Sequence, residues 1–220
     1  REHARAVAAL QQRSLWREAV ALLRRALGPR SLPPSTVAWN AAVGACERAL
    51  QWPQAVALLA EMPARRARAD AATCNTVLTA LERASRWAQA LGVLGTMRRL
   101  GIGADAVTCG AALAACAAGQ RWHEALALLL HMSVLQVQRN LISYTAAISS
   151  MAESPRWDAA LELLQEMWAA TLRPNAIAYS AAIDCLARGS HWRQSVGLIA
   201  HMQDDCSEAG APALARLAAV

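Results

Sequence analysis

The sequence predicts an all-α protein built as an α-solenoid, and three observations point to this fold. The first is composition: 53 of the 220 residues are alanine, all 22 basic residues are arginine and phenylalanine is absent, a mixture that favours helix over sheet. The second is a ladder of six tryptophans and the third a ladder of five methionines, both with a step of 35 residues apart from one tryptophan step of 36. Such a fixed period is typical of a repeat array in which each unit packs on its neighbours.

The two ladders occupy fixed places in a common phrase. Each tryptophan opens a segment such as WREAVALL or WDAALELL, and a methionine follows five of the six tryptophans after ten residues. Packing between repeats requires a large apolar side chain at the same place in every unit, so we assign both ladders to the core rather than to ligand contact. The ladders are Trp16, Trp52, Trp87, Trp122, Trp157 and Trp192, and Met62, Met97, Met132, Met167 and Met202.

The unit at residues 36–70 shows how a repeat divides into two antiparallel helices. A first helix is expected from Val37 to about Ala49, with alanines on a face smooth enough for close packing. A short break precedes a second helix from Trp52 to Met62, in which apolar residues recur at helical spacing.

About six such repeats are expected, all within one solenoid domain. In one of the breaks between helices, Ser154 followed by Pro155 is a good N-cap and first helical residue. The predicted repeats are residues 1–35 (slightly incomplete), 36–70, 71–105, 106–140, 141–175 and 176–210, with residues 211–220 as the start of a further truncated repeat.

The chain carries no pattern of a membrane or secretory segment. The uncharged stretch from Ala106 to Gln120 has only 15 residues, fewer than the roughly 20 apolar residues of a membrane-spanning helix. Arginines recur at the amino end, where a secretory signal would be apolar. Because the chain begins without methionine and ends abruptly, we interpret it as a fragment whose missing start leaves room for a targeting peptide.

Catalytic and metal-binding patterns find little support. The six cysteines form no CxxC pair and most lie among alanines on predicted helix faces, where cysteine packs as a small apolar residue. The sequence has no HxxxH pair, Gly-rich phosphate loop or nucleophile motif. We therefore expect a binding protein rather than an enzyme, with no metal and no cofactor. The polar composition of the last turn between repeats accounts for His201, Asp204, Asp205, Cys206 and Glu208.

Ligand recognition is expected where the repeats differ at one exposed polar place, and the first helix offers one. We call this place the reading position. Its residues are poor helix formers in an alanine-rich helix, each costing up to roughly 1 kcal/mol, so another requirement keeps them. They are Asn40, Asn75, Gly110, Thr145 and Ser180.

The last residue of each repeat is a second such place, which we call the closing position. It holds Asp or Asn in the central repeats, with Ser35 and Gly210 at the ends of the array. Asp and Asn directly before a helix are also favoured N-caps, each contributing roughly 1 kcal/mol. Capping and ligand contact are both open for these side chains, and one side chain can do both. The central residues are Asp70, Asp105, Asn140 and Asn175.

The repeat phrase resembles a known family. The segments QRNLISYTAAI (residues 138–148) and LRPNAIAYSAAI (residues 172–183), the period of 35 and the W-x-x-A-L-x-L-L-x-x-M phrase are together similar to pentatricopeptide repeat (PPR) proteins. The tryptophan-opened second helices resemble the versions found in some algae and other protists. The resemblance covers five full repeats and implies a right-handed superhelix.

The resemblance implies single-stranded RNA along the groove formed by the first helices, with one base per repeat. It assigns base recognition to the reading and closing positions. Under the family's code, Asn40 with Asp70 and Asn75 with Asp105 each favour U, and Thr145 with Asn175 favours A. The pairs Gly110 with Asn140 and Ser180 with Gly210 depart from the informative combinations, so the implied core site is 5′-U-U-N-A-3′.

The family also places an apolar wedge between bases near the start of each first helix. Val37, Val107, Ile142 and Ile177 fit this place, which we call the wedge position, whereas Ala72 is small for it. Packing at the helix start is an alternative interpretation of these side chains.

A basic residue late in the first helix often faces phosphate in the family. Arg48, Arg83 and Arg188 share that register, whereas Ala118 and Glu153 occupy it in two repeats. A solvated arginine is the alternative. Of the net charge of +6, residues 1–35 carry +5 and residues 141–210 carry −4, so phosphate attraction is expected mainly in the amino half.

The sequence therefore predicts sequence-selective RNA binding that acts in RNA processing, stability or translation. The resemblance implies an organelle, either chloroplast or mitochondrion. The alternative is a helical-repeat scaffold that grips a peptide, which the period of 35 and the absent W-x₂-L-G-x₂-Y first helix disfavour. A third interpretation adds a protein partner or a catalytic domain outside this fragment and leaves the groove unchanged.

Overall fold

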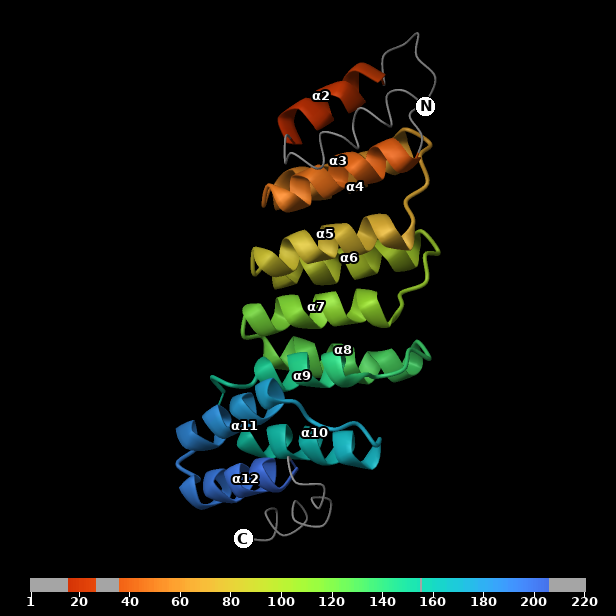
Figure 1. Ribbon diagram of the computed structural model, residues 1–220. Coiled ribbons are helices and arrows are strands. Elements are labelled where there is room, and N and C mark those ends of the chain that lie inside the picture. The colour runs from red at the N-terminus through yellow and green to blue at the C-terminus, as the bar shows by residue number, and fades with distance from the viewer. Residues whose placement is uncertain (1–15, 27–35, 155, 206–220) are drawn as a thin grey trace. The chain divides into compact units, whose positions relative to one another are not determined.

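The computed structural model of the chain describes residues 16–26, 36–154 and 156–205 (Figure 1). All regular structure in these ranges is helical, which confirms the all-α prediction. The helices alternate along the chain as first and second helices of successive repeats. They are α2 (Trp16–Ala26), α3 (Thr36–Arg48), α4 (Trp52–Ala64), α5 (Ala71–Arg83), α6 (Trp87–Arg99), α7 (Ala106–Ala118), α8 (Trp122–Val134), α9 (Leu141–Ser149), α10 (Trp157–Ala169), α11 (Ala176–Arg188) and α12 (Trp192–Asp205).

The chain divides into two compact units, and the boundary between them in the sequence falls within α7, after Ala115. In the first unit, α3 packs on its own second helix α4 and on α5, the first helix of the next repeat. In the second unit, α9 likewise packs on α10 and on α11. Neighbouring first helices therefore lie side by side within each unit, which aligns their reading positions. The single continuous solenoid expected from the period stays a prediction.

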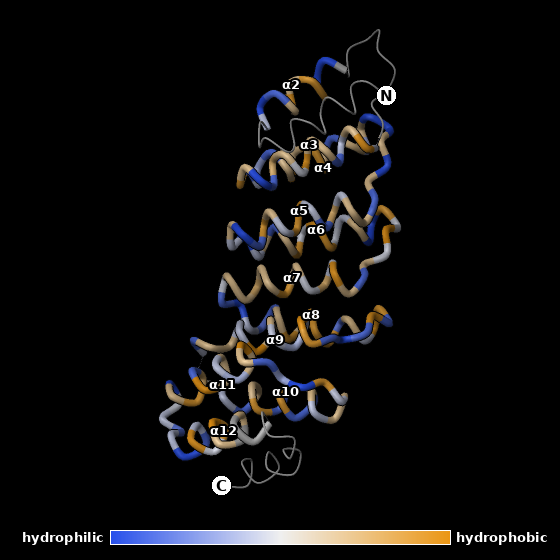
Figure 2. Tube along the Cα trace, in the orientation of Figure 1, coloured by the Kyte–Doolittle hydropathy of each residue, from blue (hydrophilic) through white to orange (hydrophobic). Residues whose placement is uncertain are grey.

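Apolar and polar residues alternate along the helices (Figure 2). No helix in the described part of the chain combines the length and the apolar character needed to cross a membrane. The core consists mainly of alanine, leucine and cysteine side chains together with the methionine ladder. Met62, Met97, Met132 and Met167 are buried, which confirms their assignment, and Met202 is partly buried.

The tryptophan ladder differs from its prediction. Its members in α2, α4, α6, α8 and α10 are only partly buried, and Trp192 is 66% exposed. The core assignment is therefore wrong for Trp192 and incomplete for the others. Each ladder tryptophan is the first residue of its second helix, so part of its ring lies at the helix end and faces solvent. The fully buried tryptophan is Trp39, in the first helix α3.

The second helices α4, α6, α8 and α10 end in the same turn. Arg66, Gly101, Gln136 and Thr171 have φ angles of 56°, 69°, 56° and 58°, the left-handed region that follows many helix ends. The next residue donates its backbone N–H to a ladder methionine, as Ala67 does to the Met62 carbonyl at 2.9 Å. The methionine ladder therefore coincides with the last turn of every described second helix from α4 to α10.

The turn inside the repeat also requires a left-handed residue, and one repeat departs from it. Leu50, Ser85, Gln120 and Ser190 have positive φ, whereas the same register in residues 141–175 is Pro155. The proline ring restricts φ to about −65°, so the common turn is not available and α9 ends early, at Ser149.

The predicted N-cap at Ser154 is wrong for the same reason. Helix α10 begins at Trp157 with Arg156 in the cap position. The Ser154 hydroxyl instead donates to the Met151 carbonyl at 2.9 Å. Elsewhere the boundaries agree with the expectations: α3 spans Thr36–Arg48, and α4 begins at Trp52 as predicted and ends two residues later, at Ala64.

The described cysteines behave as apolar core residues. Cys46, Cys74, Cys109, Cys116 and Cys185 are buried and free, which confirms their structural assignment, and Cys206 lies outside the described residues. Burial raises the pKa of Cys46, Cys74 and Cys116 to about 11, so these thiols stay protonated and unreactive at neutral pH.

Candidate nucleic-acid interface

The reading and closing positions of a repeat meet in the structure. Asn40 in α3 donates from Nδ2 to the Asp70 carboxylate, at 3.3 Å to Oδ2 and 3.4 Å to Oδ1, across 30 residues of sequence. In the second unit, the Thr145 hydroxyl donates to Asn175 Oδ1 at 3.4 Å. The two variable places identified in the sequence therefore form one polar site in these repeats.

The closing residues are also N-caps of the next first helix. Asp70 Oδ1 accepts from the Thr73 backbone N–H at 2.8 Å, and Asp105 Oδ1 accepts from that of Thr108 at 2.7 Å. Asn140 and Asn175 make the equivalent bond at 2.9 Å. Capping and contact with the reading position coexist, because one side chain has enough acceptor capacity for both.

A third residue joins each Asn–Asp pair, and sequence reasoning missed it. The hydroxyl of Thr73 donates to Asn40 Oδ1 and lies 2.7 Å from Asp70 Oδ1. In the next repeat the Thr108 hydroxyl lies 2.7 Å from Asn75 Oδ1 and 2.7 Å from Asp105 Oδ1. Both threonines are the third residue of a first helix and are buried. A hydroxyl at that register after a closing aspartate is the sequence signal that could have identified them.

These contacts fix the charge of the closing aspartates. Partial burial raises the pKa of Asp70, but hydrogen bonds from Thr73 and Asn40 outweigh it and hold the pKa below 3.8. The pKa of Asp105 is lowered by the backbone and side-chain bonds from Thr108, with a smaller contribution from Asn75. Both carboxylates are therefore ionised acceptors at neutral pH.

Two of the predicted reading residues stand apart from this pattern. Ser180 is exposed, and its hydroxyl donates to the Ile177 carbonyl of its own helix at 3.1 Å. Gly110 brings no side chain, and its partner Asn140 belongs to the other compact unit. The closing residues Ser35 and Gly210 lie outside the described residues.

The wedge position presents exposed aliphatic side chains. Val37, Val107, Ile142 and Ile177 are 61–65% exposed although each stands at the start of a buried first helix. Packing among the described residues leaves them exposed, so the alternative of helix-start packing loses its main support. Apolar side chains held in solvent beside polar reading positions can insert between bases.

The three arginines proposed for phosphate have different surroundings. Arg83 forms an ion pair with Glu47 of the preceding repeat, with 2.9 Å between Nη1 and Oε1. Arg48 is exposed near the end of α3. Arg188 is exposed beside an open cavity of about 520 Å³ that is also lined by Glu153 and Asp184. Acidic neighbours therefore weaken the positive field at Arg83 and Arg188.

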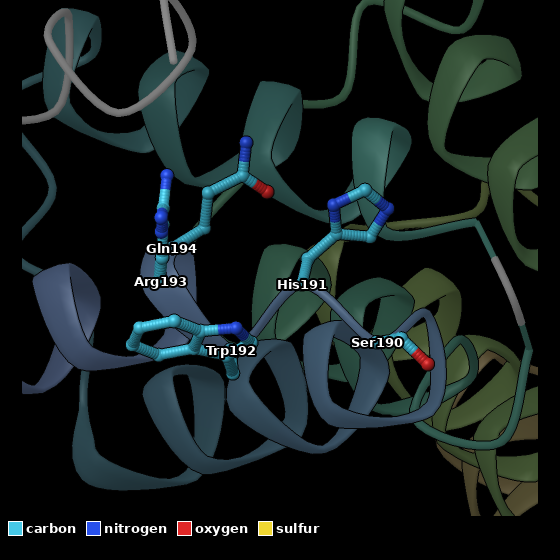
Figure 3. Close-up of a pocket in the computed structure, with 5 residues that line it drawn as sticks. All are labelled: Ser190, His191, Trp192, Arg193 and Gln194. Atoms are coloured by element: carbon cyan, nitrogen blue, oxygen red, sulfur yellow. The ribbon is translucent and has the colours of Figure 1, made fainter.

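Two further cavities among the described residues are lined by none of the predicted site residues. A cavity of about 140 Å³ is lined by five consecutive residues, Ser190 to Gln194, at the turn into α12 (Figure 3). There His191 lies against Trp157, with 4.1 Å between ring centroids. The described residues contain no cluster of three side chains able to hold a metal ion.

Comparison with protein families gives three matched segments. Residues 37–66 and 72–102 match the PPR repeat model, and residues 127–187 match the pentatricopeptide repeat domain model. No curated protein sequence matches the chain. The matched segments cover more than half of the residues and overlap every first helix from α3 to α11 except α7.

Solved structures of this kind share the fold. The pentatricopeptide repeat protein PPR10 from maize has a TM-score of 0.78 at 25% identity, over 93% of this chain and 29% of that one. PPR10 in complex with an 18-nt psaJ RNA element has a TM-score of 0.68 at 23% identity, over 88% of this chain and 28% of that one. The chain thus spans less than a third of the length of PPR10.

A third structure is a separate repeat domain. The PPR domain of Arabidopsis thaliana protein-only RNase P 1, in complex with tRNA, has a TM-score of 0.66 at 14% identity over 79% of this chain and 91% of that one. These likenesses agree with the fold, and the three matched segments, which cover more than half of the residues, show that the chain belongs to the pentatricopeptide repeat family.

Proposed function

We propose that the chain binds single-stranded RNA through its first helices, one base per repeat, with the implied core site 5′-U-U-N-A-3′. The observation that carries this proposal is the contact between Asn40 and Asp70, because it places a donor and an acceptor side by side at a reading position. Uracil offers the complementary pattern, a carbonyl acceptor beside an N–H donor, on its Watson–Crick edge.

The remaining features fit an extended RNA strand. The exposed wedge residues offer apolar faces, and every base has a face that can stack against them. The maize protein and the Arabidopsis domain were each solved with RNA, which supports RNA as the ligand class. Thr145 with Asn175 is assigned to adenine, and Asn75 with Asp105 to a second uracil.

The proposed role is a binder rather than an enzyme, because the chemistry of the described site is hydrogen bonding and stacking. A bound array covers its RNA segment and so excludes nucleases and competing RNA structure. This action suits stability, processing or translation of an organellar transcript. A catalytic domain elsewhere in a longer protein would use the same groove to choose its substrate.

The test is a fluorescence-anisotropy titration with short RNAs that contain UUNA, a scrambled RNA and the matching DNA, at two salt concentrations. Replacing Asn40 or Asn75 with alanine is expected to weaken UUNA binding about three- to tenfold, the effect of one lost hydrogen bond. Thr76→Ala is the matched control, since the Thr76 hydroxyl bonds only the Ala72 carbonyl of its own helix.

Two results would contradict the proposal. Equal, salt-sensitive binding of every strand would indicate attraction of arginine to phosphate alone. No binding at low salt by a protein with a helical spectrum would favour the protein-scaffold alternative.

A further inference from the structure

The threonine at the third residue of a first helix holds the reading asparagine of the repeat before it. The Thr73 hydroxyl donates to Asn40 Oδ1 and shares its proton with Asp70 Oδ1. The Thr108 hydroxyl likewise bridges Asn75 Oδ1 and Asp105 Oδ1, at 2.7 Å from each. Both threonines are fully buried, so neither hydroxyl is available to touch a base. Their influence on a ligand passes through the asparagine.

The hydroxyl at this register behaves differently where there is no asparagine to hold. Ser143 follows a repeat whose reading residue is Gly110, and its hydroxyl donates to the Asn140 backbone carbonyl at 2.8 Å. In the repeat that follows Thr145, the residue at this register is Ala178, which has no hydroxyl. Within the described repeats, the hydroxyl at this register therefore bonds a reading side chain only where the reading residue is asparagine.

The contacts orient the amide. On one side the Asp70 carboxylate accepts a hydrogen bond from Asn40 Nδ2. On the other side the Thr73 hydroxyl donates to Asn40 Oδ1. A flipped amide would place Oδ1 against the carboxylate, where two acceptors repel. The remaining Nδ2 hydrogen is therefore the group that the amide can offer to a ligand, and Oδ1 is already engaged.

This orientation of the amide distinguishes uracil from cytosine. Uracil presents a carbonyl oxygen where cytosine presents an amino group, so an amide that offers N–H suits uracil and one that offers a free oxygen suits cytosine. Resting on the proposed function, we propose that Thr73 and Thr108 are positioning residues that make Asn40 and Asn75 prefer uracil to cytosine.

The test compares RNAs that differ only by U or C at one base. Thr73→Val removes the hydroxyl with little change in shape and is expected to lower the U:C affinity ratio at the first base about three- to tenfold, mainly through tighter C binding. Thr73→Ser keeps the hydroxyl and should retain the ratio. Thr108→Val should act in the same way at the second base only.

Ser143→Ala is the matched control, because it removes a buried hydroxyl at the same register that bonds no reading side chain. It should leave both U:C ratios unchanged. Equal weakening of U and C binding by Thr73→Val and Thr108→Val would indicate a role in capping alone and would overturn the inference. A wild-type protein without any base preference would instead refute the proposed function, so the two failures are distinguishable.

Discussion

The Arg86 guanidinium lies over the Trp52 ring, with 5.0 Å between Cζ and the ring centroid, and so joins the second helices of consecutive repeats. Arg156 takes the same place over Trp122 at 5.4 Å, and His191 lies against Trp157. The residue before each of these second helices therefore covers the tryptophan of the preceding repeat. This contact explains why a large aromatic residue recurs at a position that is only partly buried.

Removal of one such contact is expected to have a small, measurable cost. A cation over an aromatic ring at an exposed site contributes about 0.5–1 kcal/mol, so Arg86→Ala should lower the free energy of unfolding by about that amount in chemical denaturation. Arg68→Ala, at an exposed arginine before α5, is the control and should have a smaller effect. Equal losses from both variants would contradict a specific contact with Trp52.

The left-handed turns predict opposite effects at two equivalent positions. Gly101 has a φ of 69° and Gln136, one repeat later, has a φ of 56°. Gly101→Ala should lower stability by about 1 kcal/mol and Gln136→Gly should raise it by up to about 1 kcal/mol, because only glycine adopts this region without a steric cost. Thermal unfolding measures both changes. Gly103→Ala is the control: its backbone is not left-handed, and no atom lies within 4 Å of an added Cβ.

The closing aspartates predict a loss of stability in acid. The pKa values of Asp70 and Asp105 are lower in the folded protein than the ordinary 3.8. Their contribution is therefore complete above the unfolded value and is lost as the pH falls through the folded value. Urea unfolding between pH 7 and pH 3 should show this decline. The fall of the unfolding free energy with decreasing pH should be shallower in the Asp70→Asn, Asp105→Asn double variant. An unchanged fall in this variant would contradict the assignment of the acid sensitivity to these two aspartates.

The wedge position predicts a change in binding without a change in folding. Val107 is 65% exposed, so Val107→Ala should leave the melting temperature nearly unchanged. Loss of apolar contact with a base should weaken RNA binding about threefold, less than the effect of removing an aromatic platform. Val134→Ala, at a 76% exposed valine of the second helix α8, should alter neither quantity. Equal binding by the Val107 variant would contradict the wedge.

Periodic features were the most predictable from the sequence. The period located the helices, the methionine core and the polar pairs, because each recurs at one place and depends on local chemistry. The closing residue at Asp70 had two interpretations, and the structure shows capping together with contact to Asn40. Proximity across 30 residues depends on how first helices pack, and only the family resemblance suggested it.

The features that sequence reasoning missed depend on three-dimensional context. Thr73 looks like an ordinary residue of a helix start until the fold brings Asn40 beside it. Trp192 shares the ladder's register but is largely exposed at the last described helix. Ser154 has the composition of an N-cap, yet the turn that would place it before α10 needs a left-handed residue at the register of Pro155.

The most direct test of one-base-per-repeat recognition is an exchange of the reading pair. Asn40→Thr combined with Asp70→Asn gives residues 36–70 the same pair as Thr145 and Asn175, and asparagine is already an effective cap at that position in α9 and α11. Affinities for RNAs with each of the four bases at the first site should shift in preference from U to A, with the other sites unchanged. A first-base preference that stays at U, in a variant that still binds RNA, would contradict the account.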